Sequence, residues 1–92
     1  MTEEIVLRFK MVKVRDMYDT GRVFEVPEVI GSGFSKMYMV MKNGKFKPDI
    51  QEFIDNFGEE IFEEISQGKE VSKKFKVNEI KDKWIRNFLG VN

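Results

Sequence analysis

The alternation of apolar and polar positions is clearest between Pro48 and Gly68, where apolar side chains recur at steps of three and four. Such steps place them on one stripe of a 3.6-residue helix. The apolar residues of this stripe are Ile50, Phe53, Ile54, Phe57, Ile61 and Ile65. The pattern predicts a single helix over residues 49–67, with Gly68 directly after its end and Gly58 in its interior. A glycine inside a helix destabilises it by up to about 1 kcal/mol relative to alanine.

The first part of the chain predicts a β-hairpin. Residues 3–15 alternate apolar and polar side chains with a period of two, which is typical of a half-buried strand. A turn around Gly21 follows, and residues 22–26 are expected to form the return strand. Pro27 ends this strand or marks a sheet edge, because proline has no backbone N–H to donate to a ladder.

A second hairpin is predicted over residues 36–47. Residues 36–42 are apolar on both faces, with three methionines on one side and Tyr38 and Val40 on the other. The Asn43-Gly44 pair favours a type I′ turn, and residues 45–47 are expected to pair back as a short strand.

The last quarter of the chain predicts one more strand and one more helix. The period changes at residues 70–77, which predict a strand with a basic outer face; a helix that continues into the next element is the alternative. Asn78 is expected to cap a final helix that ends at Gly90. The buried stripe expected for this helix consists of Ile80, Trp84, Ile85, Phe88 and Leu89.

The predicted order of elements is β-β-β-β-α-β-α, within one domain that spans residues 1–92. Two hairpins and a later strand make a small antiparallel sheet of about five strands. Both helices have one apolar side to bury, so the simplest arrangement is an α+β fold with the two helices packed on one face of the sheet. A small barrel-like sheet with the helices attached is the alternative.

Composition narrows the chemistry that the chain can perform. It has no cysteine and no histidine, which excludes disulfides, thiolate zinc sites and the usual base that activates a serine. Residues 31–33 form a glycine-serine-glycine loop, but neither Gly-Lys-Ser/Thr nor a helix follows it, so it does not predict a phosphate loop. Adjacent carboxylates on a helix seldom converge on a metal ion. We therefore expect no enzyme, no cofactor and no metal site.

Charge is balanced in total but not along the chain. Residues 1–48 carry nine bases and six acids, residues 49–68 carry seven acids and no base, and residues 69–92 carry seven bases and three acids. A net charge of zero disfavours a general nucleic-acid binder.

The N-terminal segment has acids where a signal peptide has bases, and no apolar run reaches the roughly 20 residues of a membrane span. We expect a cytoplasmic protein that does not contact a membrane.

The polar side of the predicted acidic helix is the first candidate binding surface. Its carboxylates belong to Glu52, Asp55, Glu59, Glu60, Glu63 and Glu64. Like charges at i,i+4 spacing destabilise a helix by roughly a few tenths of a kcal/mol per pair, and a face that only confers solubility usually mixes lysine with glutamate. This side is expected to meet a partner with a basic surface, or basic residues of the same chain. A simple solvated face is the alternative.

The methionine-rich strand is the second candidate binding surface. The residues concerned are Met37, Tyr38, Met39 and Met41. Helices on one face of a sheet leave the other face uncovered, and methionine is common at adaptable binding surfaces. The strand therefore predicts contact with another protein or with a second copy of the chain. Methionines buried in the core are the alternative.

Basic residues on the predicted sheet are the third candidate, as a nucleic-acid interface. They are Arg8, Lys10, Arg22, Lys73, Lys74 and Lys76. Cations that grip phosphates, with Tyr18 and Phe24 available for stacking, suit single-stranded nucleic acid. Lysines that merely protect sheet edges from pairing are the alternative.

These features predict a small, non-enzymatic, intracellular protein-interaction module: a regulator, an inhibitor or an assembly component. It would act through the acidic helix and the methionine-rich sheet face. Nucleic-acid binding through the basic sheet face is the alternative function.

Overall fold

The computed structural model describes residues 3–17 and 21–91. The strands within these ranges are β1 (Glu4–Asp16), β2 (Arg22–Gly31), β3 (Phe34–Met37), β4 (Met39–Lys42), β5 (Lys45–Pro48) and β6 (Val71–Lys76). The α-helices are α1 (Ile50–Phe57), α2 (Glu59–Ser66) and α3 (Lys83–Phe88), and a 3-10 turn covers Val77–Glu79.

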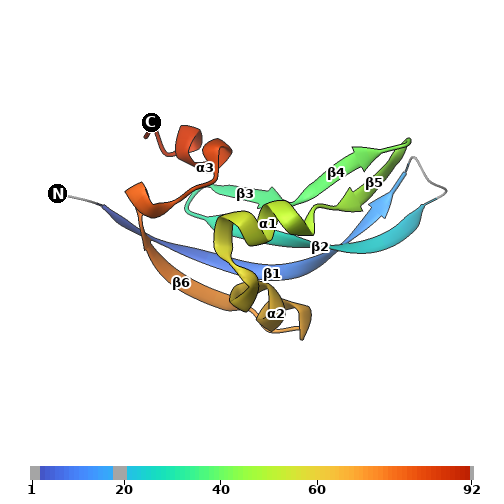
Figure 1. Cartoon of the computed structure of the whole chain (residues 1–92), viewed down its shortest axis with the longest axis horizontal. Coiled ribbons are helices and arrows are strands. Elements are labelled where there is room, and N and C mark those ends of the chain that lie inside the picture. The colour runs from blue at the N-terminus through green and yellow to red at the C-terminus, as the bar shows by residue number, and fades with distance from the viewer. Residues whose placement is uncertain (1–2, 18–20, 92) are drawn as a thin grey trace.

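The strands form two open antiparallel sheets. The larger has the order β3-β2-β1-β6, and the smaller one consists of β4 and β5. Figure 1 shows α1 and α2 in front of the larger sheet and the β4–β5 hairpin beside the far end of β1 and β2. The predicted α+β class and the first predicted hairpin are confirmed. The second hairpin is confirmed over residues 39–48, with positive φ at Asn43 and Gly44. Lys36 and Met37, which were predicted in its first strand, belong to β3 and pair with β2, so the strands form two sheets and not one sheet of about five strands. The barrel-like alternative is wrong, because neither sheet closes on itself.

The prediction that β2 ends at Pro27 is wrong, because β2 continues through it to Gly31. Pro27 faces β3 at the point where β3 has ended, and its carbonyl accepts a hydrogen bond from Tyr38 N at 2.9 Å. A residue with a backbone N–H in place of Pro27 would donate to the carbonyl of Tyr38. That carbonyl instead accepts a hydrogen bond from Asp49 N at 2.9 Å. The missing donor of the proline therefore leaves no acceptor without a partner.

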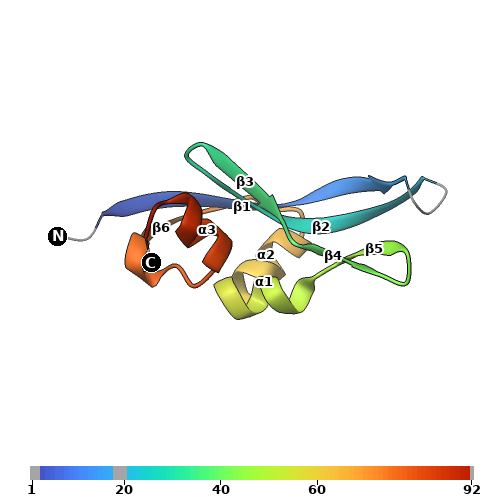
Figure 2. The same ribbon diagram turned by 90° about the horizontal axis from the view of Figure 1, so that it is seen from above.

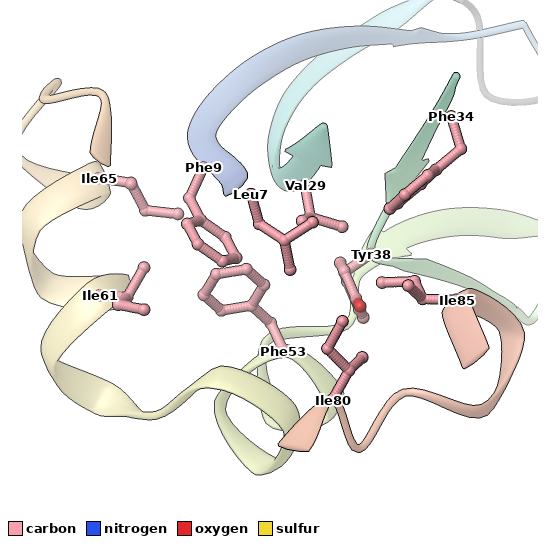
Figure 3. Close-up of a cluster of buried hydrophobic side chains, with 10 residues drawn as sticks. All are labelled: Leu7, Phe9, Val29, Phe34, Tyr38, Phe53, Ile61, Ile65, Ile80 and Ile85. Carbon is pink, nitrogen blue, oxygen red and sulfur yellow. The ribbon is translucent and has the colours of Figure 1, made fainter. Parts of the chain in front are cut away.

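The core lies between the larger sheet and the helices, which pack on one face of that sheet as predicted (Figure 2). Alternation along β1 directs Leu7 and Phe9 toward the helices, and both are fully buried. Figure 3 shows these side chains facing Phe53 of α1 and Ile61 and Ile65 of α2. The face of the larger sheet opposite the helices is uncovered near the start of β1, and we call it the uncovered face.

The segment predicted to form one helix forms two, because Gly58 interrupts it. Gly58 has φ 95° and ψ 159°, a combination that is essentially restricted to glycine. Its N–H still donates to Ile54 O at 2.7 Å, which ends α1. The break lets α1 pack against β2 while α2 packs against β1 and β6, so that two short apolar stripes follow a twisted sheet.

Gly58→Ala is expected to lower the free energy of unfolding by about 1–3 kcal/mol, since alanine is strained at this φ and ψ. A Cβ at this position would meet no described atom within 4 Å, so the change isolates the backbone effect. Chemical denaturation measures it, with Gln51→Ala on the exposed side of α1 as a control that should stay within about 0.5 kcal/mol of the parent. A continuous helix would give the opposite sign, because glycine-to-alanine changes stabilise helix interiors.

Candidate interaction surfaces

Six carboxylates of α1 and α2 form what we call the acidic surface, on the side of the helices that faces away from the sheet. They are Glu52, Asp55, Glu59, Glu60, Glu63 and Glu64, of which all but the half-buried Glu64 are exposed. The seventh acid of this segment, Asp49, caps α1 by accepting from Glu52 N at 3.2 Å. Glu52 pairs with a described cation, Lys36, whose Nζ lies 3.6 Å from Glu52 Oε1. Among the described residues, the other five carboxylates of the acidic surface form no ion pair.

The charges on α2 oppose the stability of that helix. Glu59 and Glu60 lie in its first turn, where the helix dipole favours acids. Glu63 and Glu64 lie near its C-terminal end, which favours bases, and no basic residue occupies the last turn. The i,i+4 pairs between these two turns also repel each other. Intramolecular neutralisation, one of the two expectations for this surface, does not occur on α2 in the described part of the chain.

The methionine-rich segment is bent at Tyr38, which belongs to neither β3 nor β4. The Tyr38 side chain is fully buried, with its ring centroid 5.3 Å from that of Phe53, so its predicted place in a contact surface is wrong. The three methionines remain accessible: Met37 is 40% and Met41 46% exposed, and Met39 is half-buried.

Tyr38 is buried because it joins a polar cluster that the sequence did not reveal. Asp82, which is 2% exposed, accepts hydrogen bonds from Tyr38 Oη at 2.5 Å, Lys36 Nζ at 2.6 Å and Ile85 N at 3.1 Å. The last of these bonds caps α3. Lys36 also reaches Glu52, so this group, the Asp82 cluster, connects β3, α1 and α3. Only the capping bond has a local sequence signal, an aspartate three residues before Ile85.

Burial and hydrogen bonding fix the protonation states of the Asp82 cluster. Burial raises the pKa of the Tyr38 hydroxyl, and the hydrogen bond to Asp82 raises it further. Burial alone would raise the pKa of Asp82, but the hydrogen bonds from Lys36 and Tyr38 outweigh it and hold that pKa below its usual value. Asp82 is thus ionised and Tyr38 protonated at neutral pH. With both side chains buried and their polar groups satisfied, the cluster acts as a structural tie between elements.

The basic residues are only partly brought together. Alternation within β1 and β6 places Arg8, Lys10, Lys74 and Lys76 on the uncovered face of the larger sheet. Lys73 has the other parity and lies over the ring of Phe75, 5.6 Å from its centroid.

Arg22 and the proposed stacking residues are not available to a nucleic acid on that face. Arg22 donates to Phe46 O and pairs with the buried Asp16 at 3.6 Å. Phe24 is only 9% exposed, so its predicted role in stacking is wrong, and Tyr18 lies outside the described residues. The uncovered face also includes Val6, Ile30 and Met37, and its one aromatic side chain among the described residues is the buried Phe24.

A cluster of three aromatic rings at the start of β3 lies partly in solvent. Phe34 contacts Phe88 and Trp84 of α3, with centroids 5.1 and 6.1 Å away. Trp84 is 48% and Phe88 50% exposed, although both were expected in the buried stripe of the last helix. The helix begins at Lys83, later than predicted, and its buried side chain is Ile85. Trp84 lies one position before Ile85, and Phe88 lies about one turn after Trp84, so both side chains point to the side of the helix and not into the core. We call Phe34, Trp84 and Phe88 the aromatic patch.

Comparison with models of known protein families gives no match, and neither the curated proteins nor the solved structures contain one. None of the helices in the described ranges has the length and apolar character that a membrane span requires. Nor do described acidic side chains gather in a group that could hold a metal ion.

Proposed function

We propose that this chain is a small, non-enzymatic protein-interaction module whose acidic surface binds a partner protein with a basic face. One observation carries this function: five outward carboxylates have no cation partner among the described residues, although their mutual repulsion destabilises α2. A basic partner would supply the missing cations and steer association through complementary potentials. A regulator, an inhibitor or an assembly component inside the cell would act in this way.

Nucleic-acid binding is less well supported as the alternative function. Four cations lie on the uncovered sheet face, but Glu4 and Glu28 have the same parity there and dilute the positive charge. Recognition of single strands relies on aromatic side chains that stack on bases, and the one aromatic side chain on the described part of that face, Phe24, is buried. The acidic surface would also repel a long polyanion that passed around the molecule.

The double variant Glu63→Gln/Glu64→Gln tests the proposed function by two readouts with opposite signs. Removal of two charges from the C-terminal end of α2 is expected to raise the free energy of unfolding by about 1 kcal/mol. The same variant, immobilised, is expected to lose the basic protein that the parent captures from a lysate of its native host, as identified by mass spectrometry. Capture by the parent should fall steeply with salt, because it depends on exposed charges.

The matched control is Glu3→Gln/Glu4→Gln, which removes two adjacent exposed charges outside the helices. This control should capture the same protein as the parent. If the Glu63→Gln/Glu64→Gln variant is stabilised but captures as much of the basic protein as the parent, the acidic surface is only a solvated face, and the proposed function is refuted.

A further inference from the structure

The two edges of the larger sheet differ in how well they are protected against pairing with another strand. β6 carries three lysines among its six residues, and charges along an edge discourage pairing. β3 carries one, Lys36, whose ammonium group is turned inward to Asp82 and whose side chain is 20% exposed. Nothing else in β3 is charged. The β3 edge is therefore the one open to strand addition.

The hydrogen-bond pattern identifies which groups β3 presents at this edge. Tyr38 N donates to Pro27 O, and antiparallel ladders alternate, so Phe34 and Lys36 bond to β2. The N–H and C=O groups of Ser35 and Met37 then point away from the sheet. Both residues are exposed and make no further hydrogen bond with the described part of the chain. In Figure 2, no other element crosses in front of β3, and α3 lies beside it.

Apolar surface accompanies these free backbone groups. The aromatic patch lies on the helix-covered side, where Phe34 joins β3 to α3, and Met37 lies on the other side at 40% exposure. A strand added to β3 would cover both. Backbone pairing combined with contacts to alternate side chains is the usual mode of recognition at a sheet edge.

We propose that a second copy of this chain occupies the β3 edge, so that two copies pair antiparallel about a two-fold axis and form one eight-stranded sheet. A symmetric contact must be self-complementary. Ser35 and Met37 each offer a donor and an acceptor, the aromatic patch is neutral, and Lys36 is neutralised by Asp82 and Glu52. Like surfaces can therefore meet there without repulsion, in a chain in which 35% of residues are charged. This inference is independent of the proposed function.

The exposed area sets the strength of this association. About half of each ring of Trp84 and Phe88 is accessible, which amounts to roughly 200 Å² in total. A stable interface buries about 800 Å² per partner, so the short β3 edge and the aromatic patch fall below that size. The dimer is weak and dependent on concentration. Its mass must therefore be measured by light scattering or sedimentation at several hundred micromolar and over a dilution series.

Ser35→Pro is the direct test, because it removes one outward donor from each copy and leaves the ladder with β2 intact. The dimer dissociation constant is expected to rise at least tenfold. Ser72→Pro in β6 is the matched control. Val77 N donates to Glu3 O, so the N–H of Ser72 also points outward, at the edge that this inference leaves unpaired. Ser72→Pro is expected to leave the dissociation constant unchanged, and thermal melting verifies that both variants fold.

Amide hydrogen exchange of the unmodified protein gives a second readout. The amides of Ser35 and Met37 should become protected as protein concentration rises, whereas those of Ser72 and Lys74 should not. A monomeric mass at every concentration would overturn the proposal. So would protection of Ser35 and Met37 that appears only on addition of a foreign extended peptide, because the edge would then belong to a different partner.

Discussion

Asp82→Ala is expected to lower the free energy of unfolding by about 3–5 kcal/mol. The change removes one member of a buried ion pair and leaves the ammonium group of Lys36 and the hydroxyl of Tyr38 without their main acceptor. It also removes the cap of α3, which is worth about 1 kcal/mol. Most small domains have total stabilities of about 5–15 kcal/mol, so this loss brings the variant close to unfolding. Chemical denaturation of the variant and the parent measures it.

Two controls separate the causes. Asp82→Asn keeps the size of the side chain and an oxygen for the cap but removes the charge, so it should destabilise the protein less than alanine does. Asp55→Ala removes an exposed acid of α1 and should change stability by no more than about 0.5 kcal/mol. Equal effects of Asp82→Ala and Asp55→Ala would contradict the buried cluster.

The pH dependence of stability follows from the lowered pKa of Asp82. Burial opposes ionisation of Asp82, but the hydrogen bonds from Lys36 and Tyr38 prevail, so its pKa is lower in the folded than in the unfolded chain. Such a group stabilises the fold above its unfolded pKa of about 3.9, and this contribution is lost as the pH falls through the folded pKa. The difference in stability between parent and Asp82→Ala should therefore shrink below about pH 4. A constant difference from neutral pH into strong acid would contradict this assignment.

Features of the fold that depend on neighbouring residues were predictable from the sequence. Alternation in residues 3–15 gave the long strand β1 and the correct inward face, with Leu7 and Phe9 in the core. The Asn43-Gly44 pair gave the β4–β5 hairpin. The helical stripe from Ile50 to Ile65 correctly gave Phe53, Ile61 and Ile65 as buried, and its other members are half-buried. It did not reveal the break, because a three-four spacing looks the same on either side of Gly58. The φ and ψ of that glycine separate α1 from α2.

Features that depend on distant residues were not predictable. Lys36, Tyr38 and Asp82 meet across more than forty positions of sequence. Lys36 resembles any lysine on an exposed strand, and Tyr38 continues an apparently uninterrupted strand. The exposure of Trp84 and Phe88 has a similar origin, since the stripe of a helix does not reveal how much of it a neighbouring layer will cover. The acidic surface was predictable as a pattern, whereas the lack of nearby cations is a property of the folded chain.

The two proposals concern separate surfaces, and their geometry is compatible. A two-fold axis that pairs β3 with its copy runs perpendicular to the sheet, so the helices of both copies lie on one side. Both acidic surfaces would then face the same direction. A partner with two basic sites would bind such a dimer more tightly than a monomer, because the second contact is intramolecular. Ser35→Pro would remove this gain without changing any carboxylate.

Phe53→Ala is the second change with a large expected effect, a loss of about 3–5 kcal/mol in the free energy of unfolding. Phe53 is fully buried at the centre of the interface between α1 and the sheet. Its ring centroid lies 5.9 Å from that of Phe9 on β1 and 5.3 Å from that of Tyr38. Truncation removes the transfer free energy of the ring and leaves a cavity that the surrounding structure fills only in part. For a domain of this size, the melting temperature should fall by roughly 15–30 °C.

The matched control for Phe53→Ala is Phe88→Ala, which removes the same ring from a site where half of it is already exposed to solvent. Its loss should be less than half as large, because less apolar area returns to water. Calorimetry or denaturant unfolding of both variants measures the contrast. Equal losses would mean that α1 is not packed on the sheet through Phe53. Since α1 and α2 position the carboxylates through this same interface, Phe53→Ala should also weaken capture of a basic partner, although it changes no charge.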